Sequence, residues 1–301
     1  MARKVLGLTA GSAGGSAEIC MKEALRAAEA AGAEVEMVRL DELHLPTGPD
    51  PKEPDDAAWY WERLMGCAAL IISTPIYSRT VPARLKILAD RLLGPNADAA
   101  IVDRLLQMQR DGENPAVSFR LDERVLTPRV AGFIAVGGAL TPQWKTLALP
   151  VLHTLTLSMQ IAVVDQFVVE GAGMPRSVVL DDAALARSAQ LGAHVASQAG
   201  RTFEDAEYLG PPGLCPMCHL DLVVLRGQAV ECGTCGARGQ LAADFSVTWD
   251  DFSGCVITMA ERREHYDEIL ATGARQGKER DRITELAGQY DAYDRTVRPG
   301  A

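Results

Sequence analysis

Short apolar runs alternate with stretches of helical periodicity from residue 4 to residue 199 of this chain. The run Ala69-Leu70-Ile71-Ile72 is continuously apolar, as in a strand buried on both faces of a parallel sheet. Repeated strand and helix units build a doubly wound α/β sheet, because each crossover helix returns along one face of the sheet. We expect strands at residues 4–8, 34–40, 69–74, 130–136 and 161–169, and helices at 16–31, 55–67, 82–93, 141–159 and 182–199.

The bulk composition limits the classes of partner. The 301-residue chain has a formal net charge of −10 and a pI near 5.1, which disfavours binding to nucleic acid or anionic membranes. No apolar run is long enough to cross a bilayer, and the first residues lack a signal-peptide core and cleavage site. We therefore expect a cytoplasmic protein whose partner is a small molecule or another protein.

Turn chemistry and changes of pattern divide the chain. The sequence Gly210-Pro211-Pro212-Gly213 marks a boundary, and the regular alternation is interrupted over residues 95–129 by a polar segment longer than a normal connection. This insertion is expected to form either a lid or an oligomer contact. We expect a first domain over residues 1–205, a small cysteine module over 206–242 and a strand and helical extension over 243–301.

Small residues follow the first expected strand directly. Residues 11–17 read GSAGGSA and lead into a helix. The backbone can approach an anion closely there, the helix start offers unpaired N–H groups, and Ser12 and Ser16 add hydroxyl donors. The segment is neither a dinucleotide fingerprint nor a P-loop. It predicts a site for one phosphate group, with an ordinary Gly/Ser turn that caps a helix as the alternative.

A second pattern begins where the third expected strand ends. Residues 75–91 read PIYSRTVPARLKILADR. This P-x-Y-x-x-x-x-P-x-x-L-K-x-x-x-D-R pattern, with the G-S-x-x-x-S loop of residues 11–16, resembles the NADPH-dependent FMN reductase and iron-sulfur flavoprotein branch of the flavodoxin-like superfamily. The resemblance covers about residues 3–200 and leaves 95–129 unmatched. Residues 41–50 lack the cysteine motif of the iron-sulfur members, so the resemblance is to the cluster-free reductases.

The resemblance implies a flavodoxin-like five-stranded parallel sheet of order 2-1-3-4-5 with FMN at the carboxyl ends of its strands. Open α/β sheets bind ligands at that edge in general. The first loop would hold the phosphate, the Pro-x-Tyr loop would pack on the isoalloxazine ring, and the loop after the fourth strand would border its pyrimidine side. In this sequence these contacts fall on Ser12, Gly14, Gly15, Ser16, Ala17, Pro75, Ile76, Tyr77, Ser78, Gly137, Gly138 and Ala139. A plain strand-end aromatic and plain glycine turns are the alternatives for the last two loops.

The implied activity is an FMN-dependent oxidoreduction with NAD(P)H as cosubstrate and a small acceptor, which is a quinone, a nitro- or azo-aromatic, or free flavin. No catalytic side chain is required, because the flavin carries the chemistry. Turnover is expected to be ping-pong, with both substrates using one open face in turn. An electron carrier that docks a protein partner through the cysteine module is the alternative. We also expect a homo-oligomer, either a dimer or a tetramer.

Four of the seven cysteines form two C-x-x-C pairs, Cys215 with Cys218 and Cys232 with Cys235. This spacing lets four thiolates surround one tetrahedral ion and predicts a zinc ribbon. Rubredoxin-like iron is the less favoured alternative, since the loop between the pairs lacks aromatic residues. Haem attachment through the C-x-x-C-H sequence is disfavoured, because it leaves the second pair unexplained. The remaining cysteines are expected to be core thiols: Cys20, Cys67 and Cys255.

Overall fold

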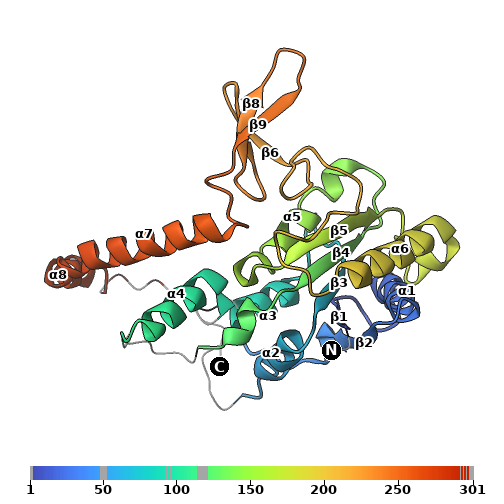
Figure 1. Ribbon diagram of the computed structural model, residues 1–301, viewed down its shortest axis with the longest axis horizontal. Helices are drawn as coiled ribbons and strands as arrows, with labels where there is room; N and C mark the ends of the chain where they lie inside the picture. The colour runs from blue at the N-terminus through green and yellow to red at the C-terminus, as the bar shows by residue number, and fades with distance from the viewer. Residues whose placement is uncertain are drawn as a thin grey trace.

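The computed structural model describes residues 3–47, 53–92, 94, 97–113, 121–291, 293, 295 and 297. Figure 1 shows a layered α/β body, a small antiparallel sheet above it, and two helices that extend away from it. Parts of the expected insertion, residues 95–96 and 114–120, lie outside the described residues, as does the end of the expected C-terminal extension.

Five parallel strands form the centre of the body in the order β2-β1-β3-β4-β5. They are β1 (Lys4–Thr9), β2 (Glu34–Arg39), β3 (Ala69–Pro75), β4 (Val130–Val136) and β5 (Ala162–Val169). All of β4 is buried, and so is β3 as far as Thr74, because helices cover both faces of the sheet. The flavodoxin-like fold and the strand order implied by the sequence are confirmed.

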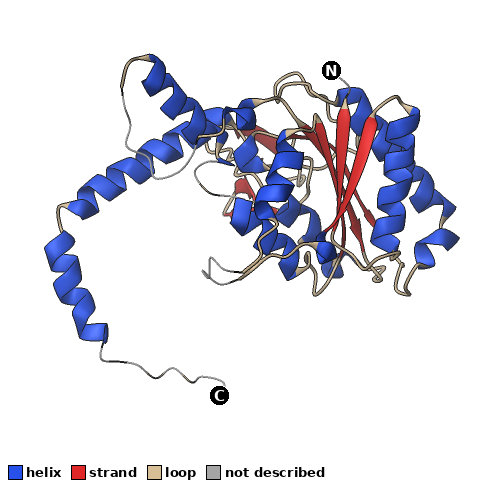
Figure 2. Ribbon diagram, turned by 90° about the horizontal axis from the view of Figure 1, so that it is seen from below, coloured by secondary structure: helices blue, strands red, loops and turns tan. Residues whose placement is uncertain are grey.

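Two layers of helices enclose the sheet (Figure 2). One face carries α1 and α6, which pack against Ile71 and Ile134, and the other carries α2, α3 and α5, which pack against Ile72 and Phe133. Their bounds are α1 (Ser16–Ala30), α2 (Ala57–Met65), α3 (Ala83–Leu92), α5 (Ala148–His153) and α6 (Asp182–Gln198). Because both faces are covered, the strand ends are where loops can form a site.

The helix expected over residues 141–159 is wrong in extent. Only α5 is α-helical there, between the 3-10 turns η4 (Pro142–Trp144) and η5 (Leu157–Met159). The hydroxyl of Thr154 donates to the Val151 carbonyl at 2.7 Å. Such bonds between side chain and backbone compete with continuation of a helix. Further 3-10 turns are η1 (Leu40–Glu42), η3 (Glu123–Leu126) and η6 (Ser177–Leu180).

The expected insertion contains a regular helix, α4 (Ala99–Arg110). It starts at Asp98, whose carboxylate accepts the backbone N–H groups of Ala100 and Ile101. Carboxylate caps of this kind satisfy N–H groups that have no partner within a helix. The alternation of strand and helix had no place for α4, so sequence reasoning treated it as a loop.

A four-stranded antiparallel sheet follows the main body, in the order β6-β7-β8-β9. Its strands are β6 (Val223–Arg226), β7 (Ala229–Cys232), β8 (Arg238–Leu241) and β9 (Val247–Asp251). The chain reaches this sheet along the outer edge of β5, where the Leu209 N–H donates to the Val164 carbonyl at 2.7 Å. This segment pairs part of an edge strand that would otherwise be open.

The last two helices, α7 (Met259–Gly277) and α8 (Arg280–Asp291), form an arm. Near its start, the buried Arg262 donates to the Ser158 carbonyl and to the Gln160 side chain. Most of α7 and all of α8 are exposed and extend from the body in Figures 1 and 2. None of the described helices combines the length and apolar character needed to span a bilayer.

Candidate active site and metal centre

Loops that follow β1, β3, β4 and β5 meet in one pocket of about 320 Å³. The pocket is lined by many of the residues expected to bind FMN: Ser12, Gly15, Ser16, Ala17, Pro75, Ile76, Tyr77 and Gly138. The other expected residues lie beside these in the same three loops: Gly14, Ser78, Gly137 and Ala139. The structure thus brings the three loops together, and their contact with a flavin stays a prediction.

Hydrogen bonds between neighbouring strands hold these loops in place. The buried Ser73 hydroxyl, at the end of β3, donates to the Ala17 carbonyl at 2.7 Å and ties α1 to the sheet. Farther along, the Ile76 N–H donates to the Val136 carbonyl at 2.8 Å. The pocket floor is therefore a continuation of the sheet, and its geometry follows from the strand order.

The start of α1 offers a place for an anion. Its N-cap is Gly15, which provides no side-chain acceptor for the first N–H groups. The Ser16 hydroxyl oxygen is buried and has no hydrogen-bond partner among the described residues. Gly14 adopts φ +68°, a conformation that favours glycine. An orphaned hydroxyl beside an uncapped helix start fits the phosphate of FMN.

A buried carboxylate that sequence reasoning missed lies under this loop. Glu18 accepts the Gly14 N–H at 3.2 Å and two guanidinium bonds from Arg39, at 2.8 and 3.0 Å. Arg39 is the largest influence that lowers the pKa of Glu18, to about 2. The carboxylate therefore stays ionised at neutral pH and fixes the loop to the end of β2.

A tight turn presents Tyr77 at the pocket mouth. Tyr77 and Thr80 exchange backbone hydrogen bonds of 2.8 and 3.1 Å, with Ser78 at φ +48° and Arg79 at φ +76° between them. Two successive positive φ angles match the type I′ hairpin turn, and non-glycine residues in that region cluster at functional sites. The Arg79 Nε atom donates to the Gln143 carbonyl at 2.7 Å, so the turn is tied to the loop after β4.

The loop after β5 is a fourth wall that sequence reasoning missed. Its members at the pocket are Ala172, Gly173, Met174 and Pro175. A Cβ atom on Gly138 would lie 2.8 Å from the Gly173 Cα atom, so only glycine permits this approach of the two loops. The signal was present in the sequence, because small residues follow the fifth strand at the same sheet edge.

Large apolar side chains are exposed on the loops around the pocket. Tyr77 is 57% exposed, Trp144 54%, and both Leu140 and Met174 73%. Exposed apolar groups gathered at a pocket indicate a binding surface for an apolar partner. Within the described parts of the insertion, residues 97–113 and 121–129, no residue lines this pocket, so these residues are not placed to act as its lid.

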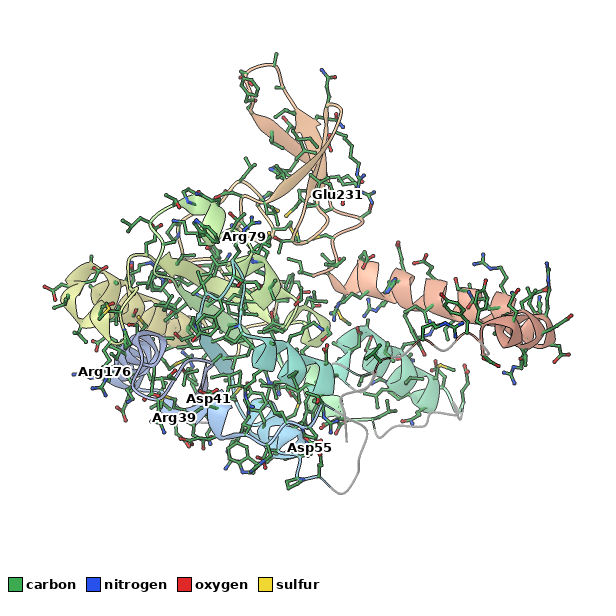
Figure 3. All side chains as sticks on the ribbon, turned by 180° about the vertical axis from the view of Figure 1, so that it is seen from behind. Arg39, Asp41, Asp55, Arg79, Arg176 and Glu231 are labelled. Atoms are coloured by element: carbon green, nitrogen blue, oxygen red, sulfur yellow. The ribbon has the colours of Figure 1, made fainter. Side chains whose placement is uncertain are left out.

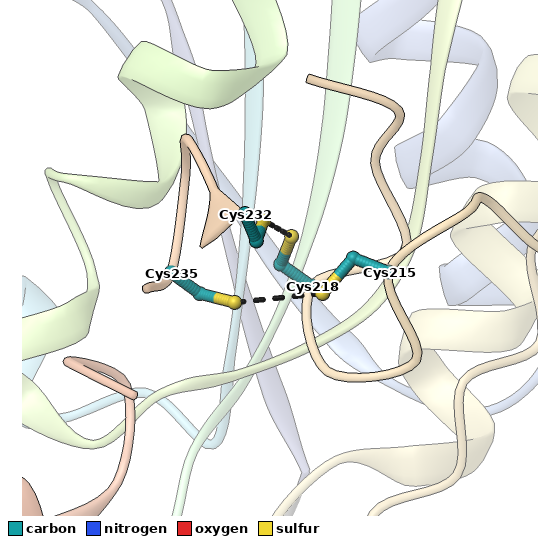
Figure 4. A group of neighbouring side chains, drawn as sticks. All are labelled: Cys215, Cys218, Cys232 and Cys235. Atoms are coloured by element: carbon teal, nitrogen blue, oxygen red, sulfur yellow. Dashed lines mark hydrogen bonds between the residues drawn. The ribbon is translucent and has the colours of Figure 1, made fainter. Parts of the chain in front are cut away.

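The four paired cysteines form one compact cluster. Their Sγ atoms all lie within 4.8 Å of one another, with 3.5 Å between Cys215 and Cys235 and between Cys218 and Cys232 (Figure 4). Sulfur atoms at about 2.3 Å from a tetrahedral zinc ion lie about 3.8 Å apart. All four side chains are at most 1% exposed. The cluster fits a closed four-thiolate metal site.

The main sheet supports this cluster directly. The buried side-chain amide of Gln166, in β5, donates to the Cys218 carbonyl at 2.7 Å, and its Oε1 lies 2.9 Å from His153 Nε2. Burial lowers the pKa of His153 to about 4, so the imidazole is neutral at pH 7. On the outer side, Tyr208 stacks on His219 with 3.7 Å between ring centroids. The cysteine cluster, with the antiparallel sheet β6–β9 beside it (the cysteine sheet), therefore contacts β5 through Gln166, which in turn meets His153 of α5.

Comparison with known proteins extends this description. The sequence profile of the NADPH-dependent FMN reductase family matches residues 3–172. A flavone synthase of Aspergillus candidus is 36% identical over 261 residues, which are 79% of this chain and 78% of that protein. The solved structure of a flavone reductase superposes with a TM-score of 0.83 at 25% identity, over 99% of this chain and 100% of that one. This chain belongs to the NADPH-dependent FMN reductase family and is an FMN-dependent NAD(P)H oxidoreductase.

Proposed function

We propose that this enzyme uses NAD(P)H to reduce a flat, apolar acceptor of the flavone class at the C=C bond conjugated to its carbonyl group. The observation that carries this proposal is the pair of exposed apolar side chains in the pocket lining, Tyr77 and Met174, with Leu140 and Trp144 also exposed after β4. The name of the flavone reductase relative agrees with such an acceptor, and the name of the flavone synthase relative, which gives flavone as the product, agrees with a ligand of the same class. Quinones, nitro- and azo-aromatics and free flavin, expected from the sequence, share the flat shape and are the competing acceptors.

The residues expected from the sequence divide the work of binding. The loop of residues 11–17 holds the phosphate, the Tyr77 turn packs on the ring, and the exposed Gly138 offers a backbone N–H to developing negative charge. Bound FMN supplies hydride transfer. Because loops lie on several sides of the pocket, we expect bound flavin to keep one face open, so that nicotinamide and acceptor occupy it in turn and turnover is ping-pong.

The same proposal includes the metal, the assembly of the chain and its division into domains. The cysteine cluster would hold one zinc ion, and the chain would form a cytoplasmic homo-oligomer. The exposed apolar residues of α8, Ile283 and Leu286, support assembly, because a short helix without packing is marginal in water. The division into residues 1–205, 206–242 and 243–301 also stays a proposal.

Initial-rate kinetics with varied NADPH and flavone test the function. We expect parallel double-reciprocal lines, and a kcat/KM for flavone at least about tenfold above that for a benzoquinone or an azo dye. The Tyr77→Ala variant should slow both half-reactions by about tenfold, since hydride transfer depends steeply on placement, while Tyr290→Ala in α8 should not. Intersecting lines would refute the shared site, and a preference for quinone would refute the flavone acceptor.

A further inference from the structure

The phosphate loop lacks a cation of its own. Residues 11–17 contain no lysine or arginine, whereas a phosphate monoester carries close to two negative charges at neutral pH. A helix N-terminus supplies only about half a positive charge. Backbone N–H groups and serine hydroxyls alone therefore leave most of the phosphate charge without a counter-charge.

The basic side chains beside α1 are already paired. Lys22 lies 2.5 Å from the Glu18 carboxylate, and Arg39 donates two hydrogen bonds to the same group. Both charges are thus largely engaged by this buried carboxylate and by Glu42, which pairs with Arg39 at 3.1 Å. Neither side chain is therefore free to act as the counter-charge of a phosphate.

Arg176, in the loop after β5, reaches the phosphate loop from across the pocket. Its Nε atom donates to the Gly14 carbonyl at 3.2 Å. A Cβ atom on Gly14 would lie 2.8 Å from its Nη2 atom, so glycine at this position makes room for the guanidinium. Figure 3 shows Arg176 beside α1, well separated from Arg79.

Two further observations indicate that this arrangement receives a ligand. Arg176 adopts φ +66°, in the left-handed region that non-glycine residues seldom occupy and that clusters at ligand sites. The hydroxyl oxygens of Ser16 and of the next residue, Ser177, are both buried without hydrogen-bond partners in the described part of the chain. An acceptor such as phosphate would suit the guanidinium and the Ser16 hydroxyl together.

We propose that Arg176 binds the phosphate of FMN and closes the loop of residues 170–176 over the loop of residues 11–17. This inference rests on the proposed binding of FMN in the loop pocket. A guanidinium forms paired, charge-assisted hydrogen bonds to phosphate that a neutral ribityl hydroxyl does not reproduce. Arg176 therefore sets the preference of the site for FMN over riboflavin.

Titration of the flavin-stripped full-length protein with FMN and with riboflavin, followed by flavin fluorescence, tests this role. We expect Arg176→Ala to weaken FMN binding by about 10- to 100-fold and riboflavin binding by less than about twofold. Arg176→Lys should recover part of the loss. The matched control is Arg79→Ala, which removes another left-handed arginine bonded to a backbone carbonyl and should leave the FMN to riboflavin ratio unchanged.

The outcomes separate this inference from the function on which it rests. Equal losses for both flavins in Arg176→Ala, or no loss for FMN, would overturn the role of Arg176 while the enzyme remains an FMN protein. A wild-type protein that binds neither flavin would overturn the proposed function and this inference together. Unfolding curves of the stripped variants establish that a changed ratio does not come from a damaged fold.

Discussion

The loop pocket and the cysteine cluster are built in opposite ways. The pocket lies between loops, and Tyr77 and Met174 on its rim are more than half exposed. The four paired cysteines are almost completely buried, and Gln166 of β5 supports the backbone of Cys218. Open sites exchange substrates, whereas closed four-thiolate sites contribute folding energy. We therefore expect turnover at the pocket and structural support from the cluster.

The largest effect should come from removing a cysteine ligand. A metal in such a site contributes on the order of 10 kcal/mol of apparent binding free energy, mostly as local folding energy. Cys218→Ser should lose the metal and unfold the cysteine sheet, measured as metal content by mass spectrometry and as a lowered Tm. Cys67→Ser is the matched control, since this cysteine is equally buried but lies in the main body, where its thiol bonds to the Leu64 carbonyl. Stoichiometric iron in wild type would refute zinc and bring the cluster into the electron path.

The second largest effect is expected at the pocket formed by the loops after β1, β3, β4 and β5. Replacing Ser12 and Ser16 together by glutamate should abolish FMN binding, with a loss above about 1,000-fold, or about 4 kcal/mol, through clash and charge repulsion. The metal content should be unchanged, which would sharpen the separation of the two sites. Flavin content after purification is the measurement, and Ser197→Glu on the exposed side of α6 is the control. Retention of FMN by the double variant would move the phosphate elsewhere.

A smaller effect should appear where the two regions touch. Gln166→Leu removes the donor to the Cys218 carbonyl, and outer partners of metal ligands typically contribute about tenfold or more in affinity. We expect about tenfold weaker zinc binding in a chelator competition, with the FMN affinity unchanged. Gln240→Leu, on an exposed position of β8, should leave both affinities unchanged. A parallel loss of FMN affinity would show that the two regions are coupled and break the comparison.

The smallest effect is expected at acid pH. The pKa of Glu18 is lowered in the folded state to about 2 from an ordinary value near 4.5, chiefly by Arg39. Its stabilising contribution is therefore complete above about pH 4.5 and is lost as the pH falls toward 2. Glu18→Gln should flatten this part of the curve of unfolding free energy against pH, measured with urea, whereas Glu29→Gln, at an exposed position of the same helix, should not. An unchanged slope would show that Arg39 and Glu18 do not stabilise the loop.

The strand positions and the loops that meet at the pocket could be predicted from the sequence. The strand order followed from the resemblance to the FMN reductases. Local signals were sufficient there, because period-2 and period-3.6 patterns and glycine-rich turns act over a few residues. Such signals failed over residues 141–159, where the Thr154 hydroxyl bonds to the backbone and the apolar pattern continues past the end of α5. They failed again for α4, which has helical periodicity but no place in a strand and helix repeat.

The sequence by itself determined which residues have the chemistry: two cysteine pairs, a phosphate-loop pattern and an aromatic turn. Only the tertiary structure decided how distant residues complete these sites. Arg176 meets Gly14 across 162 positions, and Gln166 meets Cys218 across 52. No local pattern encodes such contacts, because they depend on the packing of helices and loops around the sheet. The spacing of residues along the chain thus indicated the candidate ligand residues, and the order of the parallel strands decided which distant residues contact them.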